Sequence, residues 1–120
     1  MKRLAFYGLA VLALATGFDA NGQTNSRPVR CQIEFGGKLH VNGQCRFTPD
    51  TGGSFALENT DRNKPLFDEI LIVSVAIVSP GVAEVRGLTK SGINSRWGEA
   101  RRSTRDRACW EGADFRICAY

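Results

Sequence analysis

Short segments in which hydrophobic and polar residues alternate make up much of the chain after residue 30. The first three are Cys31–Phe35, Lys38–Val41 and Gln44–Phe47, and they are separated by Gly36-Gly37 and Asn42-Gly43. Alternation with a period of two is typical of β-strands, and such glycine-containing dipeptides are typical of two-residue hairpin turns. We therefore predict a meander of three short antiparallel strands that begins at Cys31.

The middle of the chain continues this pattern with longer and more apolar segments. Pro49–Gly53 is predicted to form a turn, Ser54–Leu57 a short strand, and Glu58–Pro65 a polar loop. Ile70–Val78 is rich in β-branched residues and is predicted to be a central strand, with Val82–Leu88 as its hairpin partner. Because no segment carries a convincing 3.6-residue apolar stripe, we predict an all-β fold, a small antiparallel barrel or sandwich stapled by disulfides.

The C-terminal segment Ala108–Tyr120 has the symmetry of a covalently closed hairpin. A turn centred on Ala113-Asp114 would place Cys109 opposite Cys118 on adjacent antiparallel strands. Directly opposed residues have Cα atoms about 4.5–5.5 Å apart, which lies within the range that a disulfide spans. The sequence therefore predicts a Cys109–Cys118 bridge.

The two remaining cysteines, Cys31 and Cys45, are predicted to form the second bridge. On a flat three-stranded meander they would lie two strand spacings apart, about 9.5 Å, which is too far for a disulfide. The bridge therefore requires the chain to swing back after Gly43. The alternative, in which both N-terminal cysteines bond to the C-terminal pair, stays open on sequence alone.

The first twenty residues have the features of a signal peptide. Met1–Arg3 is basic, Leu4–Ala15 is apolar, and small residues offer cleavage sites between about residues 15 and 20. A membrane anchor is the alternative reading, but a spanning helix needs about 20 apolar residues. We expect an exported protein, periplasmic or secreted, with a signal peptide over 1–20, a flexible leader over 21–30 and a single β domain over 31–120. Four cysteines in a small exported chain fit an oxidising compartment.

Positive charge is concentrated between Lys90 and Arg107, where six Lys or Arg residues stand against Glu99 and Asp106. Arginine guanidinium groups bind carboxylates and phosphates in a bidentate manner, and Trp97 could add a stacking face. The segment therefore predicts a surface for an anionic partner, which could be an acidic protein, a polysaccharide or an anionic envelope surface. The predicted binding residues are Ser91, Arg96, Trp97, Arg101, Arg102, Arg105 and Arg107. The alternative is a solvated loop that serves solubility only.

The other candidate residues are assigned to structure rather than chemistry. Trp110 is predicted to lie in the core, Trp97 either in a small satellite core or at a contact surface, and His40 in an ordinary strand. With one histidine and no CxxC pair, no metal site is predicted. The chain has no catalytic motif of the GxSxG, HExxH or phosphate-loop type, and its cysteines are assigned to bridges, so we predict a protein that is not an enzyme and has no cofactor.

Two resemblances add to these expectations. The run Ala108-Cys109-Trp110 followed by Cys118-Ala119-Tyr120, together with Cys31 and Gly43-x-Cys45, resembles that of small uncharacterised exported proteins of Gram-negative bacteria. This resemblance implies no activity.

The run Ser91-Gly92, Arg96-Trp97 and Trp110-x-Gly112 is similar to a pattern in periplasmic and membrane-bound inhibitors of c-type lysozyme. Those inhibitors are small β-barrels that insert a loop into the lysozyme cleft, so the resemblance implies that Ser91 and its neighbours form the inserting loop. The leading hypothesis from sequence remains a non-enzymatic exported binding domain. The alternatives are an inhibitor of a cell-wall hydrolase such as c-type lysozyme, or a structural envelope protein.

Overall fold

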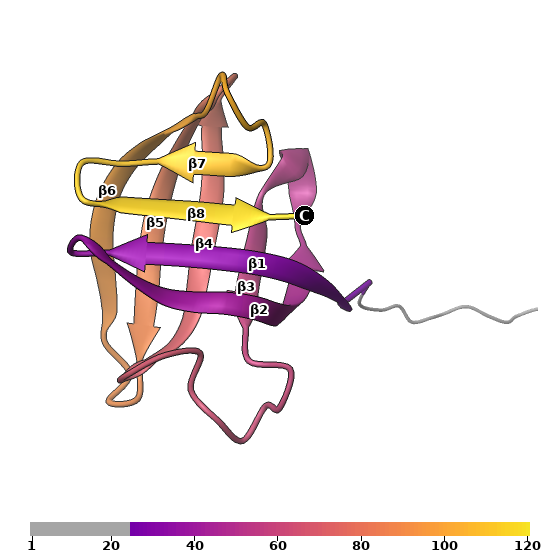
Figure 1. The fold of residues 1–120 in the computed structure, drawn as a ribbon, viewed down its shortest axis with the longest axis vertical. Coiled ribbons are helices and arrows are strands. Elements are labelled where there is room, and N and C mark those ends of the chain that lie inside the picture. Colours follow the sequence, from indigo (N-terminus) through magenta and orange to yellow (C-terminus); the bar gives the residue numbers. More distant parts are fainter. Residues whose placement is uncertain (1–24) are drawn as a thin grey trace, which may run out of the picture.

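The chain folds into a closed antiparallel β-barrel of eight strands, in a computed structural model that describes residues 25–120 (Figure 1). Each strand pairs with its neighbours in sequence, and β8 returns to pair with β1. The strands are β1 Arg27–Phe35, β2 Lys38–Pro49, β3 Phe55–Glu58, β4 Ile70–Ser79, β5 Val82–Thr89, β6 Asn94–Arg102, β7 Cys109–Glu111 and β8 Phe115–Ala119, with a 3-10 turn η3 at Thr51–Gly53. The prediction of an all-β, disulfide-stapled barrel is confirmed.

The N-terminal part of the barrel differs from the predicted three-stranded meander. The turn at Gly36-Gly37 is present, and both glycines have positive φ angles, +61° and +77°. The predicted turn at Asn42-Gly43 is wrong, because β2 runs unbroken through it and pairs with β1 from Lys38 to Phe47. A hairpin turn of this kind needs a positive φ, and Gly43 does not adopt one.

The strand β1 also begins earlier than expected. It starts at Arg27, four residues before the predicted start of the ordered domain at Cys31. The predicted signal peptide lies outside the described residues. No helix among residues 25–120 is long and apolar enough to cross a lipid bilayer.

Both predicted disulfides are present. Cys31 pairs in register with Gly43, and Cys45 pairs with Val29, so the Cys31–Cys45 bridge runs diagonally between two adjacent strands with its Cα atoms 5.9 Å apart. The expected swing of the chain after Gly43 is therefore wrong, because a continuous β2 already brings Cys45 beside β1.

The C-terminal hairpin has the predicted register. Cys109 is opposite Cys118, Trp110 opposite Ile117, and Glu111 opposite Arg116. The Cα atoms of the bridged cysteines are 4.0 Å apart. The symmetry of the segment was sufficient to predict this hairpin, because its contacts are local in sequence.

The core fills the inside of the barrel with alternate residues from its strands. Val73 and Val75 of β4, Ile33 of β1 and Ile117 of β8 are buried there, and Trp110 is buried as predicted. A barrel of eight strands has an interior that side chains can just fill. The Cys31–Cys45 bridge belongs to this cluster, whereas Cys109 and Cys118 are buried without belonging to it.

The strand order divides the connections between two ends of the barrel (Figure 1). We call the "terminal end" the one with the start of β1, the end of β8, the β2–β3 and β4–β5 connections and the β6–β7 loop. The "opposite end" carries the β1–β2, β5–β6 and β7–β8 turns and the long β3–β4 loop. This division decides which charged residues lie together.

Candidate functional site: an arginine-rich end of the barrel

The predicted basic segment does not form one continuous patch. Lys90 and Ser91 lie in the β5–β6 turn at the opposite end, whereas Arg105 and Arg107 lie in the β6–β7 loop at the terminal end. The strand β6 separates them, and eight residue steps of about 3.3 Å span roughly 26 Å. The charge that is contiguous in sequence is therefore divided in space.

Two arginines of the segment are engaged by carboxylates on the barrel wall. Arg96 forms an ion pair with Glu84, and its Nη2 donates to Glu84 Oε2 at 3.0 Å. The hydrogen bond and the charge of Glu84 together raise the pKa of Arg96. Arg101 lies 3.2 Å from a carboxylate oxygen of Glu99. Both arginines therefore have a partner within the protein.

Trp97 is a partly buried residue that packs against the barrel core. Its ring lies 4.3 Å from that of Phe35, 5.7 Å from Phe115 and 6.2 Å from Phe67, measured between ring centroids. A Cβ atom added at Gly87 would lie 2.8 Å from Trp97 Nε1, so the indole also packs against the backbone of β5. Of the two interpretations that the sequence allowed, the structure supports the core.

His40 lies in β2 next to the same aromatic cluster. Its ring stacks on Phe67 with centroids 4.6 Å apart, and Nδ1 lies 3.6 Å from a carboxylate oxygen of Asp68. Among residues 25–120 no group of three or more His, Cys, Asp or Glu side chains is arranged to hold a metal ion.

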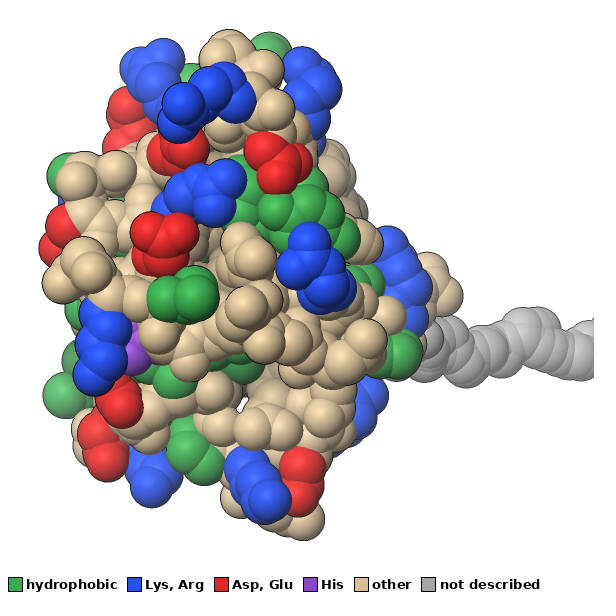
Figure 2. Space-filling model, viewed as in Figure 1, with side chains coloured by type: hydrophobic (Ala, Val, Ile, Leu, Met, Phe, Trp, Pro, Cys, Tyr) green, Lys and Arg blue, Asp and Glu red, His purple; other side chains and the backbone are tan. Residues whose placement is uncertain are grey.

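Four arginines that form no ion pair within the described part of the chain gather at the terminal end. Arg102, Arg105 and Arg107 come from the end of β6 and the β6–β7 loop, and Arg27 comes from the start of β1. None of these four forms an ion pair among residues 25–120. Figure 2 shows basic side chains along the top of the molecule, over the β6–β7 loop. We call these four residues the arginine end.

Aromatic rings hold two of these guanidinium groups in place. Arg102 Cζ lies 4.5 Å from the centroid of Trp110, and its Nη1 donates to the carbonyl oxygen of Arg107 at 2.8 Å. Arg27 Cζ lies 4.6 Å from the centroid of Phe47. Cation–π contacts of this kind favour one orientation of the guanidinium plane.

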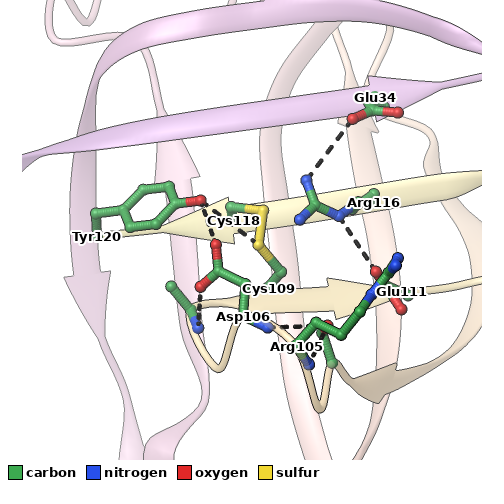
Figure 3. A network of polar contacts seen from close by, with 10 residues as sticks. Glu34, Arg105, Asp106, Cys109, Glu111, Arg116, Cys118 and Tyr120 are labelled. Atoms are coloured by element: carbon green, nitrogen blue, oxygen red, sulfur yellow. Dashed lines mark hydrogen bonds and ion pairs between the residues drawn. A yellow bond between two sulfur atoms is a disulfide. The ribbon is translucent and has the colours of Figure 1, made fainter.

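The β6–β7 loop is shaped by side-chain hydrogen bonds (Figure 3). Ser103 Oγ accepts from the backbone N–H groups of Arg105 and Asp106, each at 3.2 Å. Asp106 accepts from the backbone N–H of Ala108 at 3.1 Å and from the hydroxyl of Tyr120 at 2.7 Å. The Asp106 carboxylate is therefore turned toward the C-terminus of the chain rather than toward the arginine end.

The contact between Tyr120 and Asp106 shifts the pKa of both groups. The Tyr120 hydroxyl and the Ala108 N–H stabilise the carboxylate and lower the pKa of Asp106, and the same hydrogen bond raises the pKa of Tyr120. The Tyr120 hydroxyl also lies 3.7 Å from Cys109 Sγ, so Tyr120 lies against the Cys109–Cys118 disulfide. Arg30 also lies over the Tyr120 ring, with Cζ 4.3 Å from its centroid.

Arg116 of β8 shows the contrasting environment on the barrel wall (Figure 3). It lies between two carboxylates, 3.7 Å from Glu34 and 3.2 Å from Glu111. Its charge is balanced from both neighbouring strands. Among the described residues, the arginines with carboxylate partners thus lie on the wall of the barrel, whereas those without one lie at the terminal end and also elsewhere, as Arg62 does in the β3–β4 loop.

Sequence reasoning missed one member of the arginine end, Arg27, which it placed in the flexible leader. A signal was present, because the alternation of the first strand continues upstream: Val29 is buried like Cys31 and Ile33. Sequence reasoning also missed the hydrogen bond between Asp106 and Tyr120, since no local pattern links residues 14 positions apart.

No family model, no curated protein and no solved structure matches the chain.

Proposed function

We propose that the protein is a non-enzymatic, exported binding domain that contacts an anionic partner through the arginine end. The observation that carries this proposal is that four arginines gather at one end of the barrel, and that none of them has a carboxylate partner among residues 25–120. The two disulfides fit an oxidising compartment outside the cytoplasm.

The local structure favours binding because the arginine side chains and their loop are already ordered before a ligand binds. Stacking on Trp110 and Phe47 orients two guanidinium groups, and hydrogen bonds to Ser103 and Asp106 hold the loop that carries the others. Side chains that are already ordered lose less conformational entropy when a ligand binds. Guanidinium groups then offer paired N–H donors that match carboxylate or phosphate oxygens.

The partner classes expected from sequence share this chemistry. An acidic protein, an acidic polysaccharide and an anionic envelope surface all present carboxylate or phosphate groups. Binding should weaken as salt rises, because the Debye length falls from about 10 Å at 0.1 M to about 3 Å at 1 M ionic strength.

The experiment compares two triple variants that remove equal charge from the two ends of the barrel. The first is Arg102→Gln, Arg105→Gln and Arg107→Gln, at the arginine end. The second is Arg62→Gln, Lys64→Gln and Lys90→Gln, in exposed connections at the opposite end. We expect the first to weaken binding to heparin and to anionic vesicles at least tenfold, and the second to change it less than about threefold.

Stability serves as the internal check on this comparison. Because Arg102 packs on Trp110, the double variant Arg105→Gln and Arg107→Gln is measured beside the triple one. Exposed substitutions of this kind usually change stability by no more than about 0.5 kcal/mol each. Equal loss of binding at both ends, with unchanged melting temperatures, would mean that only net charge matters and would refute the proposal.

The second candidate function is inhibition of a c-type lysozyme, and the exposure of Ser91 favours it. This residue lies in the β5–β6 turn, its Oγ lies 3.0 Å from Thr89 Oγ1, and the exposed Ile93 follows it. In the run Trp110-x-Gly112 this chain has Glu111 at the middle position, where the inhibitors have a lysine, and this difference counts against the resemblance. If the inhibitor resemblance holds, the protein slows a c-type lysozyme at sub-micromolar concentration and Ser91→Arg abolishes the effect. Activity that stays unchanged at large molar excess would remove this candidate.

A further inference from the structure

A hollow of about 170 Å³ opens at the terminal end of the barrel, inside the arginine end. Phe47 of β2, Phe55 of β3 and Trp110 of β7 line it, together with Arg102 and Arg107. The remaining lining residues are one glycine and two alanines. Aromatic rings and methyl groups thus supply its apolar surface, and two guanidinium groups lie at its margin.

The residues around the hollow form two stacked pairs. Phe47 stacks on Phe55 with centroids 5.0 Å apart, and Arg27 lies over Phe47. On the side of β7, Arg102 lies over Trp110, which is only 2% exposed. A guanidinium group that stacks through its face keeps in-plane N–H groups available for an oxyanion.

The side chains that line the hollow favour an anionic ligand with an apolar group over a sugar. The polar side chains that border the hollow, those of Arg102, Arg107 and Trp110, only donate hydrogen bonds. An oxyanion, which only accepts, therefore suits them better than a sugar hydroxyl, which must also donate. The rings and the alanine methyl groups of the lining give an apolar group a surface to contact. The volume is adequate, because a buried apolar cavity of about 150 Å³ accommodates benzene.

We propose that the hollow binds the acidic end of a small amphiphile: a carboxylate or a phosphate ester carried on a short alkyl chain or a single aromatic ring. The inference rests on the proposed function and narrows the anionic partner to a lipid-like one. The oxyanion lies against Arg102 and Arg107, and the first carbons of the chain lie against Phe47, Phe55 and Trp110.

The test is an NMR titration that follows the indole N–H signal of Trp110. The probes are hexyl phosphate and hexanoate, with inorganic phosphate and hexanol as the separate halves of the first ligand. We expect both amphiphiles to shift the Trp110 signal in a saturable manner. Phosphate alone and hexanol alone should each bind at least tenfold more weakly.

Two single variants separate the hollow from the general charge of the protein. Arg107→Gln, which changes a lining residue, should raise the Kd for hexyl phosphate at least tenfold. Arg62→Gln removes the same charge from an exposed residue at the opposite end that does not line the hollow, so it should raise the Kd less than threefold.

The outcomes distinguish this inference from the proposed function. If hexyl phosphate does not bind while heparin binding still depends on the arginine end, the inference is overturned and the proposed function stands. If neither ligand binds, both are overturned. Inorganic phosphate binding as tightly as hexyl phosphate would refute the apolar part of the site, and hexanol binding as tightly would refute the anionic part.

Discussion

Replacement of Gly87 by alanine tests the assignment of Trp97 to the core. The new Cβ atom would lie 2.8 Å from Trp97 Nε1 and 3.0 Å from two carbon atoms of the same ring. Ordinary carbon contacts are about 3.5–4.0 Å, so the indole would have to move by at least half an ångström. The neighbouring rings of Phe35 and Phe115 restrict that movement.

The magnitude follows from two opposing effects. Overpacking a core by a methyl group costs about 1–3 kcal/mol of folding free energy. Glycine in a strand is less favourable than alanine by about 0.5–1 kcal/mol, because it loses more backbone entropy on folding. The net loss for Gly87→Ala should therefore lie between about 0 and 2.5 kcal/mol.

Gly43→Ala is the matched control, since Gly43 also lies within a strand and has no neighbour within 4 Å of an added Cβ. It should gain the 0.5–1 kcal/mol without the steric cost. The difference between the two variants then isolates the overpacking energy, about 1–3 kcal/mol.

Urea unfolding followed by tryptophan fluorescence measures both variants, and a difference of 2 kcal/mol moves the midpoint by on the order of 1 M. Near-ultraviolet circular dichroism reports on the packing of the indole in the same samples. Equal midpoints for the two variants, with unchanged Trp97 signals, would mean that the ring does not pack on β5. Trp97 would then be better explained as a residue of a contact surface.

The remaining predictions concern the terminal end and its disulfide. Peptide mapping without reduction should recover Cys109 linked to Cys118, and a link from either residue to another cysteine would contradict the fold. Replacing both cysteines by alanine should cost about 3 kcal/mol, because the bridge restricts the unfolded chain; a longer loop would make the cost larger. Tyr120→Phe should raise the pKa of Asp106, measured by NMR titration of its carboxyl carbon, since the largest cause of the lowered pKa is lost. A lowered carboxyl pKa adds stability that is present above the unfolded pKa of about 3.9 and is lost as pH falls through the folded pKa. The variant should therefore show a weaker loss of stability on acidification, and an identical pH profile would show that this hydrogen bond is not formed in solution.

The sequence predicted the parts of the fold that rest on local pairing. The register of Cys109 with Cys118 and the turn at Gly36-Gly37 depend on residues close in the chain, so a symmetric spacing and two glycines were sufficient. Asn42-Gly43 carried an equally strong local turn signal, but β1 extends upstream to Arg27 and offers β2 a longer partner. The tertiary pairing overrode the local preference.

The candidate site was harder to predict because linear charge does not determine spatial charge. A nine-residue strand runs through the basic segment and moves Ser91 away from Arg105 by the length of the barrel. Arg27 reaches the site from the other end of the chain, which only the closure between β1 and β8 explains. The unpaired state of the arginines depends on where the carboxylates of other strands lie, and no pattern in one segment encodes it.

The most direct test of the central claim is an NMR titration of the side-chain Nε–H signals of all arginines with a soluble polyanion at low salt. The account predicts saturable shifts for Arg27, Arg102, Arg105 and Arg107, with much smaller changes for Arg96, which its carboxylate partner already holds. Shifts of equal size at arginines on every side of the barrel, or shifts that centre on Arg62 at the opposite end, would contradict it.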